Sequence, residues 1–229
     1  MILSVHQPNF IPWMGYFYKI ASSDIFILLD KVQYPRGKSV ANRNKIKTIN
    51  GVVELVVPIS KSRGNEGKIN YNELAFAETH WYAKLLKTIY YSYSKSMHFN
   101  EVYFWLENLF QMSSFCDMNI RFIEELTLKL KLNTIIKKQS EFNLDSALKN
   151  NDLIIALCQI NQATEYLSGT GANAYNDLEL YNLNSLKLSY TNFKHPVYSQ
   201  LYGEFESNLS VIDALFNLGF EDTRKLLIH

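Results

Sequence analysis

A short apolar run at residues 2–5 is followed directly by His6, Gln7 and Pro8. An apolar, β-branched run of this length is typical of a buried strand. Pro8 has no amide hydrogen to donate to a neighbouring strand, so a strand that begins at residue 2 is expected to end before it. The sequence therefore predicts that His6 and Gln7 lie at the carboxyl end of the first strand.

A helix and a second strand are predicted next. After Pro12, apolar residues recur at intervals of three and four, as Trp13, Tyr16, Phe17 and Ile20. This spacing gives a helix one apolar face. A second apolar run at residues 25–29 then ends in Asp30. Strand, polar loop, helix and strand in this order predict an α/β fold with a mostly parallel central sheet, in which ligands usually bind at the carboxyl ends of the strands.

The next part of the chain changes from strands to helices. A β-hairpin is predicted at residues 46–59, because Asn50-Gly51 is the strongest short hairpin signal. The polar, glycine-containing segment 60–70 is predicted to be a surface loop. From Thr79, which is expected to cap a helix, to about residue 132 the apolar pattern is helical. We expect residues 1–229 to form one domain, with a helical subregion at about residues 79–132.

The remaining elements continue the α/β pattern. Within the helical subregion, two further amphipathic helices are predicted at residues 102–112 and 118–132. We then predict, in order, a short strand at 134–136, a polar loop at 139–141, a helix at 146–161, a strand that enters the glycine-rich loop 168–171, and a strand at 186–190. The last helix is expected to end at Gly219, with a short helix after it.

Composition excludes several classes of protein. The formal net charge is +1, so the overall charge favours neither nucleic acid nor an anionic membrane as a partner. The cysteines, Cys116 and Cys158, lie in apolar helical contexts without CxxC spacing and are expected to be buried thiols. No apolar stretch is long enough for a transmembrane helix, and the amino terminus lacks the pattern of a signal peptide. We therefore expect a cytoplasmic protein.

Two interpretations are open for His6. An imidazole titrates near neutral pH, so at the loop end of a sheet it could act as a general base or carry protons. Alternatively, it could only cap the end of the sheet with hydrogen bonds. Asp30 has the same two interpretations, because its carboxylate could orient His6 or bind a sugar hydroxyl, or could cap the turn that follows.

A basic segment follows the second strand. Residues 31–47 contain six basic side chains and no acidic one, the densest positive patch in the chain. Arg43 and Lys47 are four residues apart, which places them on the same side of either a helix or a strand. Two neighbouring cations suit a diphosphate or a carboxylate. The alternative is a solvated basic surface.

Other candidate motifs carry less information. The loop Ser168-Gly169-Thr170-Gly171 could expose backbone amides to an anion, but it lacks the lysine and the spacing of a P-loop. Ser210 and Asp213 are three residues apart at the start of the last helix, which helix capping explains without any function. The histidines are scattered and no nucleophile elbow is present, so we predict no metal site and no serine nucleophile of that type.

Taken together, the segments HQPNFIPWMGYFYKI, DIFILLDKVQY and NRNKIK, with YLSG, YSQ and LSVIDALFNLG further along, resemble the WbqC-like protein family of bacterial polysaccharide gene clusters. The resemblance runs nearly end to end, and the amino-terminal block is its most specific part. In the family a histidine often follows Trp81 a few residues later, whereas this chain has YAKLL there. The resemblance implies that the motif positions form the site, with His6 and Asp30 as catalytic residues. It implies the following substrate-binding residues: Gln7, Trp13, Tyr16, Gln33, Asn42, Arg43, Lys47, Ser168, Gly169, Tyr175, Tyr198 and Gln200.

The same resemblance implies cytoplasmic work on activated sugars before a polysaccharide is assembled. Our leading hypothesis is the transfer of an acyl group, which could be an aminoacyl group, to the amine of a nucleotide-linked amino-deoxy sugar. His6 would be the base, and Arg43 and Lys47 would bind the pyrophosphate. No tightly bound cofactor is expected, and the acyl donor would be a thioester on coenzyme A or on an acyl carrier protein.

Two alternatives remain. The opening also resembles that of nucleotidyltransferase-like α/β folds, but these carry a second histidine after the glycine, and here Gly15 is followed by Tyr16. The protein could also be a non-catalytic scaffold that binds a nucleotide sugar. Replacing His6 by Asn should abolish the turnover of an enzyme and leave its fold, whereas a binding protein should lose little beyond affinity.

Overall fold

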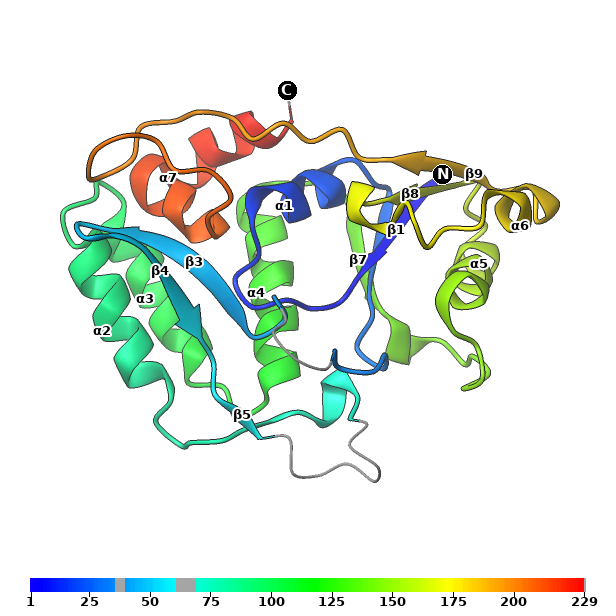
Figure 1. The fold of residues 1–229 in the computed structure, drawn as a ribbon, viewed down its shortest axis with the longest axis horizontal. Coiled ribbons are helices and arrows are strands. Elements are labelled where there is room, and N and C mark those ends of the chain that lie inside the picture. Colours follow the sequence, from blue (N-terminus) through cyan, green and yellow to red (C-terminus); the bar gives the residue numbers. More distant parts are fainter. Residues whose placement is uncertain (36–39, 61–68, 229) are drawn as a thin grey trace.

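A five-stranded parallel sheet forms the centre of the computed structural model, which describes residues 1–35, 40–60 and 69–228 (Figure 1). Its strands are β7 (Ile135–Lys138), β2 (Ile25–Leu28), β1 (Ile2–His6), β8 (Glu165–Ser168) and β9 (Lys187–Tyr190), in that order across the sheet. Each neighbouring pair is parallel. The predicted fold class is confirmed, including the strand that leads from residue 2 to the His-Gln-Pro sequence.

The strand order is that of a doubly wound sheet. In chain order the five strands lie as 3-2-1-4-5, so the chain leaves β1 in one direction and returns to its other side with β8. In sheets of this kind, ligands bind at the carboxyl ends of the strands, at the point where the strand order reverses. Here that point lies between β1 and β8.

Helices cover both faces of the sheet, because alternate residues of each strand point to opposite sides. Leu3 and Val5 of β1 belong to an apolar cluster with residues of α5 (Asn150–Ile160) and α6 (Leu178–Leu183). Phe26 and Leu28 of β2 belong to the other, larger cluster. That cluster includes residues of α1 (Met14–Ala21), α4 (Phe115–Lys129) and α7 (Val211–Leu227).

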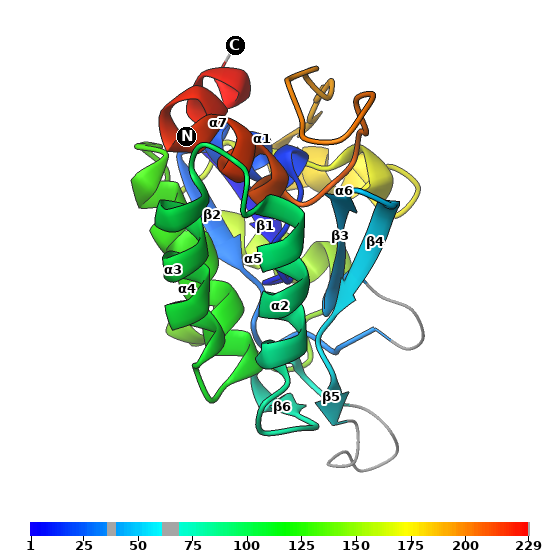
Figure 2. The same ribbon diagram turned by 90° about the vertical axis from the view of Figure 1, so that its left-hand side faces the viewer.

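A long insertion separates β2 from β7. It contains β3 (Arg43–Thr48), β4 (Gly51–Val56), the short pair β5 (Ile59–Ser60) and β6 (Ala75–Phe76), and the helices α2 (Tyr82–Tyr93) and α3 (Phe99–Phe110). Figure 2 shows α2 beside the β3–β4 hairpin and α3 on the other side of α2, and contacts join α2 to β3 and to α3, and α3 to α4. This insertion is the predicted hairpin and helical subregion.

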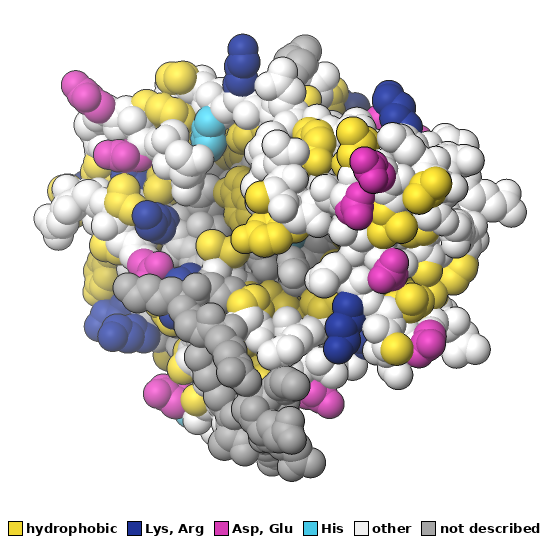
Figure 3. Space-filling model, turned by 45° about the vertical axis from the view of Figure 1, so that its right-hand side comes forward, with side chains coloured by type: hydrophobic (Ala, Val, Ile, Leu, Met, Phe, Trp, Pro, Cys, Tyr) yellow, Lys and Arg dark blue, Asp and Glu magenta, His cyan; other side chains and the backbone are white. Residues whose placement is uncertain are grey.

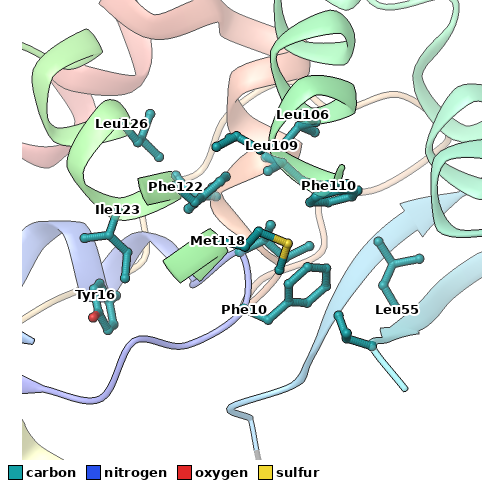
Figure 4. Packing of buried hydrophobic residues seen from close by; sticks show 14 of the residues in the cluster. Phe10, Tyr16, Leu55, Leu106, Leu109, Phe110, Met118, Phe122, Ile123 and Leu126 are labelled. Atoms are coloured by element: carbon teal, nitrogen blue, oxygen red, sulfur yellow. The ribbon is translucent and has the colours of Figure 1, made fainter. Parts of the chain in front are cut away.

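The larger cluster joins the insertion to the sheet. In Figure 4, Phe10 from the loop after β1 lies near Met118 of α4, Phe110 of α3 and Leu55 of β4. The side chain of Phe10 is fully buried, and its ring lies 5.6 Å from that of Phe110. The loop after β1 is therefore fixed by the core.

Several boundaries differ from the predictions. Thr79 does not cap α2, because the helix begins at Tyr82 and Trp81 precedes it. In the hairpin, Thr48 pairs with Gly51, so the turn is one residue earlier than predicted and Gly51 opens β4 with a φ of 101°. Residues 139–141, predicted as a loop, form a short 3-10 helix, and the pattern did not reveal α6, β5 or β6. Most of the predicted surface loop, residues 61–68, lies outside the described residues.

The break predicted at Gly219 is confirmed. Gly219 interrupts α7 with a φ of 76° and a ψ of −179°. Two features exclude a side chain at Gly219. A Cβ atom would lie 2.7 Å from the ring of His98, and a φ of this value favours glycine. Among the described residues, no helix is long and apolar enough to span a membrane.

Candidate functional site

The two strands at the reversal point separate toward their carboxyl ends. Leu3 of β1 is paired with Tyr166 of β8, and the recorded pairing of these strands goes no further, whereas β1 pairs with β2 as far as His6. Beyond Leu3, a side-chain hydrogen bond joins the two strands, since the Ser4 hydroxyl donates to the carbonyl of Leu167 at 3.0 Å. The gap opens where the order of the strands predicts a ligand.

One face of the molecule is hollowed. Figure 3 shows the hollow near the middle of that face, with hydrophobic side chains inside it and charged side chains mostly toward the margin of the view. Recesses with apolar walls and a few polar groups are the usual form of small-molecule sites.

The loop after β1 is held from two sides. Phe10 donates its amide to Ala41 at 2.9 Å. The carbonyl of Ile11 accepts from the Asn44 side chain at 2.7 Å and from the Ser210 hydroxyl at 2.6 Å. Ile11 has a φ of 34°, a conformation that a β-branched residue rarely adopts and that these contacts stabilise. These contacts thus hold the loop in place relative to β3 and α7.

His6 lies at the start of this loop, beside two aromatic rings. Its ring centroid is 4.8 Å from that of Tyr16 and 5.9 Å from that of Trp13. Its Nδ1 lies 3.2 Å from the carbonyl oxygen of Gln7. A carbonyl can only accept, so Nδ1 carries the hydrogen in the neutral ring, and Nε2 keeps its lone pair.

The surroundings keep His6 uncharged. Burial, aided by the nearby Lys19 ammonium, lowers the pKa of His6 to about 3, while the Gln7 carbonyl opposes this shift. The Gln7 carbonyl also accepts from the Tyr16 hydroxyl at 3.0 Å, and burial raises the pKa of Tyr16. His6 and Tyr16 are therefore both neutral at physiological pH.

Asp30 contacts the backbone that follows a different strand, β7. Its Oδ1 accepts from the backbone amide of Ser140, after β7, at 2.9 Å. Asp30 and His6 lie at the same end of the sheet, as predicted. However, within the described residues no hydrogen bond or ion pair joins them, so the structure does not bring them together as a pair. The role of Asp30 in orienting His6 stays a prediction.

Gln33 and Asn42 lie in structural positions. Asn42 is buried, donates to the carbonyl of Val57 at 2.8 Å and accepts from the Tyr34 hydroxyl at 3.0 Å. Gln33 is exposed and forms an isolated β-bridge with Asn70. These contacts hold the basic segment against Val57 and Asn70, further along the insertion, and they leave substrate binding by Gln33 or Asn42 as a prediction.

Arg43 and Lys47 already have protein partners. The Arg43 guanidinium lies 3.1 Å from a carboxylate oxygen of Glu54, on the paired strand β4. The buried Lys47 ammonium donates to Gln200 Oε1 at 3.3 Å and to the carbonyl of Glu204. Each cation thus contacts a different partner within the protein, and binding of an anion by the two together stays a prediction.

A buried polar cluster surrounds Asp213. Its two carboxylate oxygens accept from the hydroxyls of Tyr93, at 2.6 Å, and Tyr198, at 2.8 Å. Burial raises the pKa of Asp213, whereas the hydroxyl donors, the nearby Lys47 and the Gln200 side chain lower it. Lys47, Tyr198 and Gln200, predicted as binding residues from separate motifs, therefore meet here, and they fasten the coil of residues 191–210 to α7.

The loop after β8 begins at the gap between β1 and β8 and carries three of the predicted binding residues, Ser168, Gly169 and Tyr175. Ser168 is fully buried, and its hydroxyl accepts from the Asn176 side chain at 2.9 Å. The same Asn176 amide also lies 3.2 Å from the hydroxyl of Tyr190. Gly169 is half-buried, and Tyr175 is 80% exposed. Ser168 therefore helps to hold the loop, Tyr175 lies on its outer surface, and substrate binding by either residue stays a prediction.

Metal and thiol chemistry find no support among the described residues. That part of the chain holds no group of three or more His, Cys, Asp or Glu side chains that could bind a metal ion. Burial raises the pKa of both Cys116 and Cys158 to about 12, so the thiols stay protonated.

Lys19 belongs to the amino-terminal block that carries the family resemblance, but the sequence predicted no specific role for it or for Tyr93. Lys19 lies three residues after Tyr16 and one before Ile20, so the helical spacing could have placed it on the buried face. Its ammonium donates to the carbonyl of Val5 at 2.8 Å. Tyr93 lies four residues after Ile89 and eight after Leu85, a spacing that only indicates an apolar helix face, and no local pattern points to its hydroxyl contact with Asp213.

Comparisons with known proteins agree with the motif. The sequence pattern of the WbqC-like protein family matches residues 7–225. The chain is also 31% identical over 223 residues to the uncharacterized protein Rv1507c of Mycobacterium tuberculosis, a match that covers 96% of this chain and 94% of that protein. No solved structure matches the chain. The resemblance drawn from the amino-terminal block thus extends over nearly the whole sequence.

Proposed function

This chain belongs to the WbqC-like protein family, and from this membership and the surroundings of His6 we propose that it is an acyltransferase. The acceptor would be the amine of a nucleotide-linked amino-deoxy sugar, and the donor a thioester of coenzyme A or of an acyl carrier protein. The reaction would serve the biosynthesis of a bacterial surface polysaccharide, O-antigen or capsule. It would take place in the cytoplasm, before the polymer is assembled.

The observation that carries the proposal is a neutral imidazole at the reversal point of the sheet. Nε2 of His6 holds a lone pair because Nδ1 faces the Gln7 carbonyl. Strand orders of this kind bind nucleotides at the reversal point. A nucleotide sugar held there could present its amine to His6.

The reaction needs one proton to be moved. The sugar amine attacks the thioester carbonyl, a C–N bond forms, and the C–S bond breaks. Nε2 of His6 would accept the amine proton and return it to the thiolate that leaves. A diphosphate bound near His6 would raise the pKa of the imidazole above its value of about 3 and make Nε2 a stronger base.

A ligand screen followed by a turnover assay tests the proposal. A ligand that binds only the native state raises the midpoint of thermal unfolding. We expect a nucleotide-linked amino sugar to raise it, and a mixture with an acyl thioester to yield an N-acylated sugar and a free thiol. The His6→Asn variant should keep its fold and lose turnover. Full turnover in a folded His6→Asn variant contradicts the assignment of the base.

Nucleotidyl transfer remains the second candidate, because the strand order 3-2-1-4-5 also suits a nucleoside triphosphate. Stabilisation by a triphosphate with magnesium, without any response to amino sugars, would favour this candidate. Release of pyrophosphate in the presence of a sugar phosphate would then establish it.

A further inference from the structure

Lys19 is a buried ammonium without an anionic partner. The residue is 5% exposed, and its recorded side-chain partner is the carbonyl of Val5, 2.8 Å away. An ammonium group has three donors, so two remain to be used. In the part of the chain that the structure describes, Lys19 forms no ion pair. A buried charge that lacks a counter-ion is unfavourable, which makes this position receptive to an anion.

The ammonium lies on the side of β1 that faces the gap. The carbonyls of Ile2 and His6 accept amides from the side of β2, at Asp24 and Leu29. Carbonyls of successive residues in a strand point to opposite sides, so the Val5 carbonyl points toward β8, beyond the last recorded pair of these strands. Lys19 thus reaches the point where the two strands separate.

From this position, we propose that Lys19 is the anion-binding group of the site and takes the diphosphate of a nucleotide sugar. The choice of a diphosphate rests on the proposed function; the anion site itself rests on the geometry. Arg43 and Lys47, the cations expected from the sequence, contact Glu54 and the 200–204 segment, whereas Lys19 has no anionic partner among the described residues.

Binding of the anion should take up a proton. Burial lowers the pKa of Lys19 to about 7, so above this pH the free protein holds it mostly neutral. Among the described residues, the titratable group that interacts with the Lys19 charge is His6 on β1, which stays uncharged between pH 6 and 9 because its pKa is lowered to about 3. A diphosphate that favours the ammonium raises the pKa of Lys19, so affinity should fall as pH rises from about 7 to 9.

Calorimetry at pH 8 measures both effects. The probes are UDP-glucose and dTDP-glucose, whose esterified diphosphates do not titrate in this range, and inorganic pyrophosphate. Titrations in buffers of different ionisation enthalpy give the number of protons taken up. We expect proton uptake by the wild type with at least one nucleotide sugar. The Lys19→Met variant should lose this uptake and about tenfold or more in affinity, since charge-assisted hydrogen bonds are lost.

Matched variants separate a local effect from a general one. Lys187→Met also removes one positive charge, but from an exposed side chain at the first residue of β9 that is paired with Glu165 at 3.0 Å. It should bind like the wild type. Lys19→Gln provides a second variant if Lys19→Met does not fold, and the proton uptake of the wild type needs no variant.

The outcomes distinguish this inference from the proposed function. Nucleotide-sugar binding that is unchanged in Lys19→Met overturns the inference and leaves the function intact. Pyrophosphate binding that depends on Lys19, without binding of any nucleotide sugar, supports the anion site and speaks against the function. Absence of binding by all three probes overturns the inference.

Discussion

The hydroxyl of Tyr93 donates a 2.6 Å hydrogen bond to Oδ1 of the buried Asp213, although the two residues are 120 positions apart in the chain. This contact joins α2 of the insertion to α7 at the other end of the sequence. Tyr198 donates to the second carboxylate oxygen at 2.8 Å. The carboxylate therefore ties together the insertion, the coil of residues 191–210 and the last helix.

Removing either hydroxyl should destabilise the fold. We expect Tyr93→Phe and Tyr198→Phe each to lower the free energy of unfolding by about 1–3 kcal/mol, because each leaves a buried carboxylate with one donor fewer. Urea denaturation measures the change. Tyr91→Phe, at a side chain that is 67% exposed, is the control and should have little effect. Additivity in the double variant is the test of coupling. If Tyr93→Phe and Tyr198→Phe together lower the free energy of unfolding by the sum of their separate effects, the two hydroxyls do not act as a cluster with Asp213.

Gly15 permits a close contact between α1 and the coil after β9. A Cβ atom at Gly15 would lie 2.9 Å from the Phe193 ring and 3.0 Å from the indole of Trp13. We expect Gly15→Ala to lower the free energy of unfolding by about 1–3 kcal/mol through overpacking. Gly171→Ala, where the added atom would meet nothing within 4 Å, is the matched control. Equal stability of the two variants would show that the coil does not pack on Gly15.

His6 should remain neutral far below the ordinary pKa of an imidazole. Nitrogen NMR of the free protein should show a hydrogen on Nδ1, and protonation only near the lowered pKa of about 3. The unfolded chain binds a proton near pH 6.5, so it holds more protons than the folded chain between pH 6.5 and 3. The contribution of His6 to stability is therefore lost as pH falls through this window, and His6→Asn should flatten the acid side of the stability profile. A normal imidazole titration in the folded protein would contradict this prediction.

Lys19 should affect stability above neutral pH, whereas His6 affects it at acidic pH. Its pKa is about 7 in the folded protein and 10.5 in a model peptide, so the unfolded chain binds more protons between these values. The wild type should therefore become more stable relative to Lys19→Met as pH rises from about 7 to 10. Thermal unfolding of both proteins at several pH values measures the difference. A constant difference across this range would mean that Lys19 is not held neutral.

The sequence by itself determined the local elements and the end of the sheet that carries the loop. The run at residues 2–5 stops at Pro8 for a reason that lies within the chain, since proline has no amide hydrogen. The break at Gly219 could be predicted in the same way, because glycine readily adopts a positive φ. Both features depend on backbone chemistry that a few neighbouring residues contain.

Tertiary structure alone decided which side chains meet. Arg43 and Lys47 share a strand, yet one pairs with Glu54 of the neighbouring strand and the other with Gln200, 153 positions away. Lys19, which reads as one polar residue in an apolar helix, lies at the gap between β1 and β8 because β8 returns to the sheet beside β1. Partners so far apart in the chain are brought together by the order of the strands and by packing, which no local pattern contains.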